Sequence, residues 1–169
     1  MATDEFQGAA VLSRTPTFAS SILYLIVAGG VAFLPLFLHA STGLSFAGDA
    51  LFIVVVTPIV VAGLWFSYNN VAYTSQVWYH RAAKDATASK KTLSKVAEAA
   101  QTSAITTASV YYALFFNNLA FLVLFSLFTL GASGLHPGMR YAVATLIPVA
   151  ALGYLTSPAA APAAVAAAK

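Results

Sequence analysis

The sequence predicts an all-α, polytopic membrane protein with four transmembrane helices and a short basic cytosolic helical hairpin between helices 2 and 3. Of its 169 residues 60% are apolar and only 8% are charged, whereas a soluble domain carries about a quarter charged residues. The charged residues leave gaps of 34, 31, 41 and 28 residues, at 15–48, 50–80, 99–139 and 141–168. Each gap is long enough for a membrane-spanning helix, which needs about 20 apolar residues.

The first predicted span covers 18–38 and follows a cytosolic N-terminal segment, 1–17. Thr15 is expected to cap this helix and Pro16 to occupy its first position, where the missing N–H is not needed. The acidic residues near the start fit neither a signal peptide nor a transit peptide, so the span is predicted to be a retained anchor. Pro35 should bend or end the helix.

The second predicted span covers 50–68, with Asp49 as its N-cap. Pro58 lies inside this span as a tolerated kink, because neighbouring helices can satisfy the carbonyl that it frees. Helices 1 and 2 together occupy 18–74.

A basic cytosolic segment is predicted at 75–107. The net charge lies here, because 80–98 sums to +3 and the rest of the chain sums to zero. Its basic residues are Arg81, Lys84, Lys90, Lys91 and Lys95. Such a run is often only a solvated face or a topology determinant. Binding to anionic lipid headgroups or to ribosomal RNA phosphates is the functional alternative, and the sequence does not separate these two ligands.

The third and fourth predicted spans cover 113–132 and 137–157 within the segment 108–157, and Pro137 opens the fourth. The Ala/Pro-rich tail, 158–169, is low in complexity and is expected to be disordered or frayed. Four spans place both termini and the middle segment on one side. That side holds seven basic residues and the other holds one, so the positive-inside bias predicts that it is cytosolic.

Residues that could carry catalysis are missing, so no enzyme activity, cofactor or metal is predicted. Cysteine is absent, and His39, His80 and His136 fall in three different connections without metal-ligand spacing. No ionisable side chain is expected inside a span, which argues against a transporter or channel. Gly29 and Gly30 are expected to form a close-packing surface of the first span, together with Ala28 and Ala32, and not a phosphate loop.

Two similar hexads, at 68–73 and 116–121, supply the polar residues expected at membrane depth. Asparagine is costly in hydrocarbon unless it forms a hydrogen bond. The asparagines expected to pack helices or contact a subunit are Asn69, Asn70, Asn117 and Asn118. They either pin the hairpin of the second and third spans or face the helix of a partner, and the first interpretation is favoured.

Four short motifs carry a resemblance to a known family. They are Ser-Tyr-Asn-Asn-Val at 67–71, Phe-Phe-Asn-Asn at 115–118, His-Pro-Gly-Met-Arg-Tyr at 136–141 and Leu-Thr-Ser at 155–157. Together with the four spans and the basic segment, they resemble gamma subunits of the translocon-associated protein (TRAP) complex, also called signal sequence receptor gamma. The resemblance covers about 18–157, and the cytosolic segment is shorter and less charged than is usual in that family.

The resemblance implies a non-enzymatic, multi-pass subunit in the endoplasmic reticulum membrane, with both termini cytosolic. Such a subunit would assemble with the TRAP alpha, beta and delta subunits beside the Sec translocon, among membrane lipids, and help to anchor the ribosome during co-translational translocation. In the family the cytosolic hairpin docks on the large ribosomal subunit, where it touches rRNA and ribosomal protein. Carried onto this chain, the contacts would come from Arg81, Lys84, Lys90, Lys91 and Lys95.

Two other classes of protein are also compatible with the sequence. A structural accessory subunit of a respiratory or photosynthetic membrane complex also tends to be small, helical and free of intramembrane charge. A small transporter or membrane-embedded enzyme would instead need a buried polar residue, such as Asn117, for its activity.

Overall fold

The computed structural model describes residues 15–87 and 95–157, which form α-helices joined by turns. The helices are α1 (Phe18–Ser41), α2 (Ala50–Thr87), α3 (Lys95–Gly131) and α4 (Pro137–Leu155). Each of them is long and apolar enough to cross a membrane. The predicted all-α fold with four candidate spans is therefore confirmed for the part of the chain that the structure describes.

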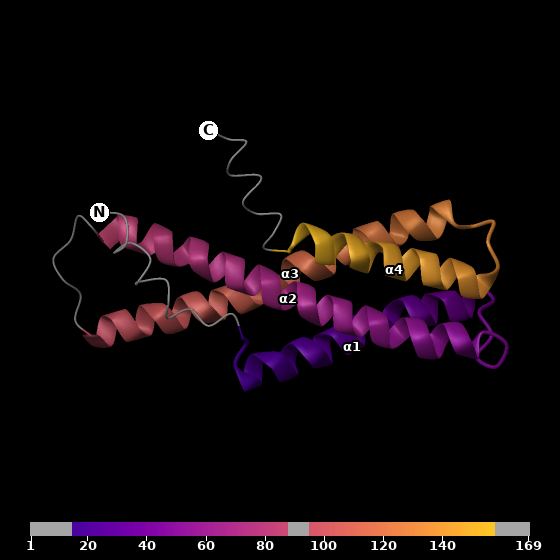
Figure 1. The fold of residues 1–169 in the computed structure, drawn as a ribbon, viewed down its shortest axis with the longest axis horizontal. Helices are drawn as coiled ribbons and strands as arrows, with labels where there is room; N and C mark the ends of the chain where they lie inside the picture. The colour runs from indigo at the N-terminus through magenta and orange to yellow at the C-terminus, as the bar shows by residue number, and fades with distance from the viewer. Residues whose placement is uncertain (1–14, 88–94, 158–169) are drawn as a thin grey trace.

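The helices lie side by side, with α2 and α3 much longer than α1 and α4 (Figure 1). α2 packs against each of the other three, α3 packs mainly on α2 and α4, and α1 packs mainly on α2. The connections 42–49 and 132–136 lie at the same end of the molecule, which we call the loop end. At the opposite end, the hairpin end, α2 and α3 run on beyond the start of α1 and the last turn of α4 (Figure 1).

The part of α2 and α3 that continues toward the hairpin end is called the extension, and it comprises 69–87 and 95–112. The predicted spans stopped at 68 and began at 113, so the helices continue for 19 and 18 residues more, or about 28 Å at about 1.5 Å per residue. Neither stretch contains glycine or proline, so no residue interrupts the helix where the composition becomes polar. The predicted boundaries therefore mark a change of polarity within continuous helices.

The start of α1 differs from the prediction. Its N-cap is Thr17, whose Oγ1 accepts a hydrogen bond from the Ser20 backbone N–H at 3.3 Å, and not Thr15. Pro16 precedes the cap and is not the first helical residue. The helix also continues through Pro35 for almost two more turns, because a single proline removes only one backbone bond and neighbouring groups can compensate.

The starts of α2 and α4 agree better with the sequence. α4 begins at Pro137 as predicted, and the Nδ1 atom of His136 caps it by accepting from the Gly138 backbone N–H at 3.3 Å. At α2 the Asp49 carbonyl accepts the first backbone bond, from Ile53. Asp49 therefore takes the predicted N-cap position, while its carboxylate bonds to the preceding turn, as described below.

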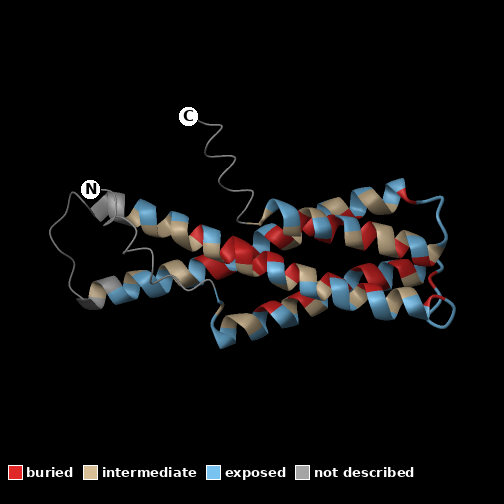
Figure 2. Ribbon diagram, viewed as in Figure 1, coloured by how far each residue is buried: buried red, intermediate tan, exposed pale blue. Residues whose placement is uncertain are grey.

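The core follows the facing sides of the helices, and the extension becomes more exposed toward its tip (Figure 2). On α1 the buried small residues are Ala28 and Ala32, which are 0% and 1% exposed. A Cβ atom at Gly29 or Gly30 would meet nothing within 4 Å. Of the predicted close-packing surface, Ala28 and Ala32 pack within this chain, whereas Gly29 and Gly30 lie on the sides of the helix away from the core.

The close approach occurs instead between α2 and α4. A Cβ atom at Gly63 would overlap the Cγ1 methyl of Val149, which is buried. Because valine is β-branched and stiff about χ1, this methyl has little freedom to move away. Gly63 therefore lets α2 and α4 pack at their observed separation.

Gly63→Ala should push α2 away from α4 and lower the free energy of unfolding by about 1–3 kcal/mol. The measurement is thermal unfolding of the purified protein in mild detergent. Gly30→Ala is the matched control, because its new methyl meets no neighbour, and it should leave the melting temperature unchanged or slightly higher. The double variant Gly63→Ala, Val149→Ala should recover stability. Equal melting temperatures for Gly63→Ala and the parent would contradict this account of the α2–α4 contact.

Candidate functional site

A layer of hydrogen-bonded polar side chains crosses the helices where the extension begins. We call it the polar layer, and it consists of Ser67, Tyr68, Asn117, Asn118 and Thr156. Ser67 Oγ donates to Asn117 Oδ1 at 2.6 Å, and Asn117 Nδ2 donates to the Ala113 carbonyl at 2.9 Å. Ser67 Oγ also lies 3.2 Å from Thr156 Oγ1, at the end of α4. One serine hydroxyl therefore connects α2 to both α3 and α4.

Tyr68 completes the layer on the side of α1. Its hydroxyl donates to Asn118 Oδ1, and its ring packs against Tyr24 of α1 with the ring centroids 5.7 Å apart. Both tyrosines are almost fully buried. A polar group in hydrocarbon has to find its partner inside the protein, so these bonds fix the rotation of α3 against α2.

The predicted asparagines do not form one cluster. Asn117 and Asn118 both accept hydrogen bonds from α2, but their partners are Ser67 and Tyr68 and not the asparagines of the other hexad. Asn70 is buried, and its Nδ2 has no hydrogen-bond partner among the described residues. Asn69 is half-buried. Hexad similarity indicated the right depth, whereas the pairing depends on helix rotation, which the sequence alone does not reveal.

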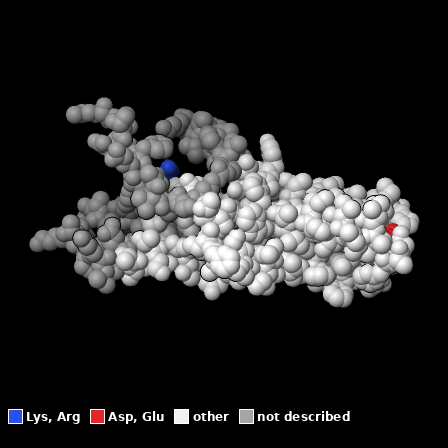
Figure 3. All heavy atoms as spheres, turned by 60° about the horizontal axis from the view of Figure 1, so that its bottom comes forward, with Lys and Arg blue, Asp and Glu red and all other residues white. Residues whose placement is uncertain are grey.

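Of the five basic residues predicted to bind the ribosome, only Arg81 has a described side chain, and it is exposed on the extension. Lys84 lies in α2 and Lys95 opens α3, so both belong to the extension. Lys90 and Lys91 lie outside the described residues. On the face shown in Figure 3 the described surface is almost free of charge, apart from a basic and an acidic site at opposite ends. The basic residues are thus concentrated toward the hairpin end.

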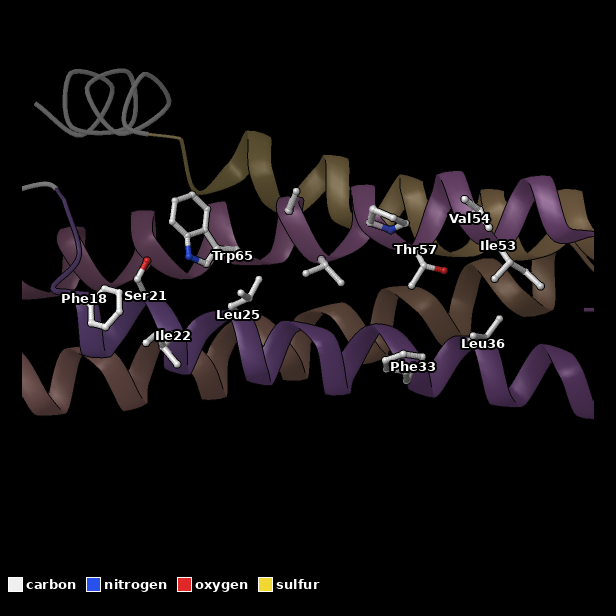
Figure 4. A pocket seen from close by; sticks show the side chains of 13 residues that line it. Phe18, Ser21, Ile22, Leu25, Phe33, Leu36, Ile53, Val54, Thr57 and Trp65 are labelled. Atoms are coloured by element: carbon white, nitrogen blue, oxygen red, sulfur yellow. The ribbon is translucent and has the colours of Figure 1, made fainter.

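An apolar groove of about 920 Å³ lies between α1 and α2. Phe18, Ile22 and Leu25 of α1 face α2 across it, with Trp65 on the opposite wall near the Phe18 end (Figure 4). The hydroxyl of Thr57 also lines the groove, and it is hydrogen-bonded to Tyr141 OH at 2.8 Å. The groove has no charged residue and no acid–base pair among its lining residues. It can therefore accommodate hydrocarbon.

Polar contacts tie the two connections together at the loop end. The buried carboxylate of Asp49 accepts from the Ser45 backbone N–H at 2.9 Å and lies 3.5 Å from His136 Nδ1. The Arg140 guanidinium donates to Thr42 Oγ1 at 2.6 Å. These contacts join the start of α4 to the end of α1 and to the start of α2.

The histidines lie in different places from those predicted. His39 is in the last turn of α1 and His80 is within α2, so neither falls in a connection. His39 is buried, with its ring edge-on to Phe125 and Tyr141 at centroid distances of 5.7 Å. Arg140 lies in the first turn of α4, so ionisable side chains do occur in the candidate spans near the loop end, where none was expected. No group of metal-ligating side chains comes together in the described ranges.

Ser67→Ala should destabilise the protein, because it removes the donor to the buried Asn117 Oδ1 and the contact with Thr156. The expected loss is about 1–2 kcal/mol, measured by thermal unfolding in detergent. Ser126→Ala is the control, since Ser126 is exposed and bonds only to the Leu122 carbonyl of its own helix. Equal effects of the two substitutions would show that the polar layer does not hold the helices together.

The described chain is thus an α-helical membrane protein with four candidate spans, a polar layer and a helical extension. No protein-family model matches the sequence, and no curated protein matches it. The function has to be inferred from the residues of the chain itself and from their arrangement.

Proposed function

We propose that this chain is a non-enzymatic subunit of a translocon-associated complex in the endoplasmic reticulum membrane, and that it helps to anchor the ribosome at the protein-conducting channel. The observation that carries the proposal is the extension. α2 and α3 continue without interruption past the ends of the predicted spans and lead into the segment 80–98, which has a net charge of +3.

The extension is suited to presenting charge at a distance from the membrane. Each of its two helices adds about 28 Å beyond the predicted spans. Its base is packed, because Val71, Ala72, Ser109 and Val110 are buried, while side chains toward the tip, such as Arg81, are exposed. A basic tip on a packed helical base can reach a large anionic surface outside the headgroup region.

The ribosome is such a surface, and the resemblance to TRAP gamma subunits names it as the partner. Basic side chains bind RNA phosphates through electrostatic attraction and counterion release, so the affinity falls steeply with salt. The positive-inside bias supports the same orientation, because it predicts that the hairpin end lies in the cytosol. The TRAP alpha, beta and delta subunits and the Sec translocon would then be the neighbours within the membrane.

Arg81, Lys84, Lys90, Lys91 and Lys95 are the proposed ribosome contacts, so changing all five to Gln should weaken ribosome association in a salt-dependent way. If all five contact phosphates, the affinity of the parent should fall by about two orders of magnitude between 50 and 200 mM salt, and the variant should show a much flatter dependence. The measurement is co-sedimentation with ribosomes from digitonin-solubilised membranes across a salt series.

The matched control for that experiment is the pair Arg14→Gln and Lys169→Gln, which removes basic residues from the same predicted side but outside the extension. This pair should leave the salt dependence unchanged. Parent-like binding of the five-residue variant at every salt concentration would refute the proposed contacts. Recovery of the chain with respiratory or photosynthetic subunits, identified by mass spectrometry, would favour the alternative of an accessory subunit of such a complex.

Replacing Asn117 and Asn118 by Leu should loosen assembly with the partner subunits or lower the abundance of the chain, because α3 would lose both bonds to α2. Blue-native electrophoresis of solubilised membranes measures the intact complex. Ser126→Leu, on the exposed side of the same helix, is the control and should assemble normally. Normal levels of intact complex in the double variant would show that the asparagine pair is dispensable.

A further inference from the structure

A second recess, which we call the foot pocket, lies where α4 ends and the extension continues. It has a volume of about 660 Å³ and is enclosed by α2, by α3 and by the last residues of α4. Its four aromatic lining residues are Trp78, Tyr79, Tyr112 and Phe116. Pockets of about 300–1,000 Å³ are typical of small-ligand sites. The foot pocket is thus large enough for a lipid headgroup.

The aromatic rings occur in two pairs. The rings of Tyr112 and Phe116 are stacked, with centroids 5.9 Å apart and planes 15° apart, and those of Trp78 and Tyr79 meet edge to face at 5.1 Å. The negative faces of such rings attract cations, and groups of them bind quaternary ammonium ions. None of the residues lining the pocket is charged, so no resident cation competes for these faces.

Two hydroxyl groups of the pocket have the same preference. Thr74 Oγ1 and Ser75 Oγ each donate their proton to a backbone carbonyl of their own helix, at 2.9 and 3.0 Å. Their oxygen atoms keep free lone pairs but have no proton left for a ligand. The foot pocket therefore presents electron-rich groups, which favour a positively charged guest over an anionic one.

Arg81, the basic residue nearest to the pocket along α2, is exposed and is not among the lining residues. An aromatic recess without a resident cation fits the quaternary ammonium group of a choline headgroup.

The depth of the pocket identifies the source of that headgroup. The pocket lies beside the last turn of α4, at the end of that candidate span, and tryptophan and tyrosine are the residues that gather at the membrane–water interface. We propose that the foot pocket binds the choline headgroup of a phosphatidylcholine molecule, with the trimethylammonium group against the aromatic rings.

The test is native mass spectrometry of the full chain in mild detergent, with phosphatidylcholine, phosphatidylethanolamine and phosphatidylglycerol of identical acyl chains added in equal amounts. Phosphatidylcholine should be retained about fivefold over phosphatidylglycerol, in keeping with the strength of partly exposed cation–π contacts. Equal retention, or a preference for phosphatidylglycerol, would overturn the proposal and assign lipid binding to the basic segment.

Two neighbouring tyrosines provide matched variants. Tyr112→Ala should abolish the preference for phosphatidylcholine, and Tyr112→Phe should keep it, because the ring and not the hydroxyl forms the site. Tyr111→Ala is the control, since Tyr111 is 65% exposed and does not line the pocket. If Tyr112→Ala fails to fold, Trp78→Ala replaces it, because Trp78 is 64% exposed and contributes little to the core. Preference retained by the alanine variant, or lost equally in the Tyr111 control, would contradict the site.

A photoreactive p-benzoylphenylalanine at position 112 then identifies the occupant in native membranes. A crosslink of phospholipid mass supports the proposal, and a crosslink to a polypeptide would show that a partner protein fills the pocket instead.

Discussion

The hydrogen bond from Ser67 to Asn117 is the contact on which the arrangement of the other helices depends. Both side chains are fully buried, so neither can exchange its partner for water. The bond fixes the rotation of α3 against α2, and the Thr156 hydroxyl beside it places the end of α4. The direction of the extension and the shape of the foot pocket both follow from these positions.

The sequence predicted the spans because their signal is local. Long gaps between charges and an opening proline, Pro137, are readable without knowledge of any neighbour. The contacts between helices are not local. Ser67 and Tyr68 carried no signal that would pair them with Asn117 and Asn118, because pairing depends on the rotation and crossing of two helices. The asparagines could therefore be placed in depth, and their partners required the structure.

Composition marks where polarity changes and does not mark where a helix ends. The predicted spans end at 68 and begin at 113, and α2 and α3 continue beyond these residues because no helix breaker lies there. Of the small-residue surface predicted on α1, Ala28 and Ala32 occupy the buried side, whereas Gly29 and Gly30 do not. Among the described glycines, Gly63 and Gly138, which were not predicted to pack, are the two whose added Cβ would overlap a neighbouring helix. Whether a small residue packs against a neighbouring helix therefore depends more on the face of the helix it occupies than on its residue type.

The unequal lengths of the helices have a consequence for the surrounding bilayer. α4 has 19 residues and α1 has 24, which correspond to about 28 Å and about 36 Å of helix. A short hydrophobic span draws the adjacent lipid leaflets together, while a longer one tilts or thickens them. α4 is thus close to the hydrocarbon thickness of about 30 Å, whereas α1 exceeds it, so the mismatch with the bilayer lies on the side of α1. Neighbours with short transmembrane segments are matched to the flank formed by α4, and neighbours with longer segments to the flank formed by α1.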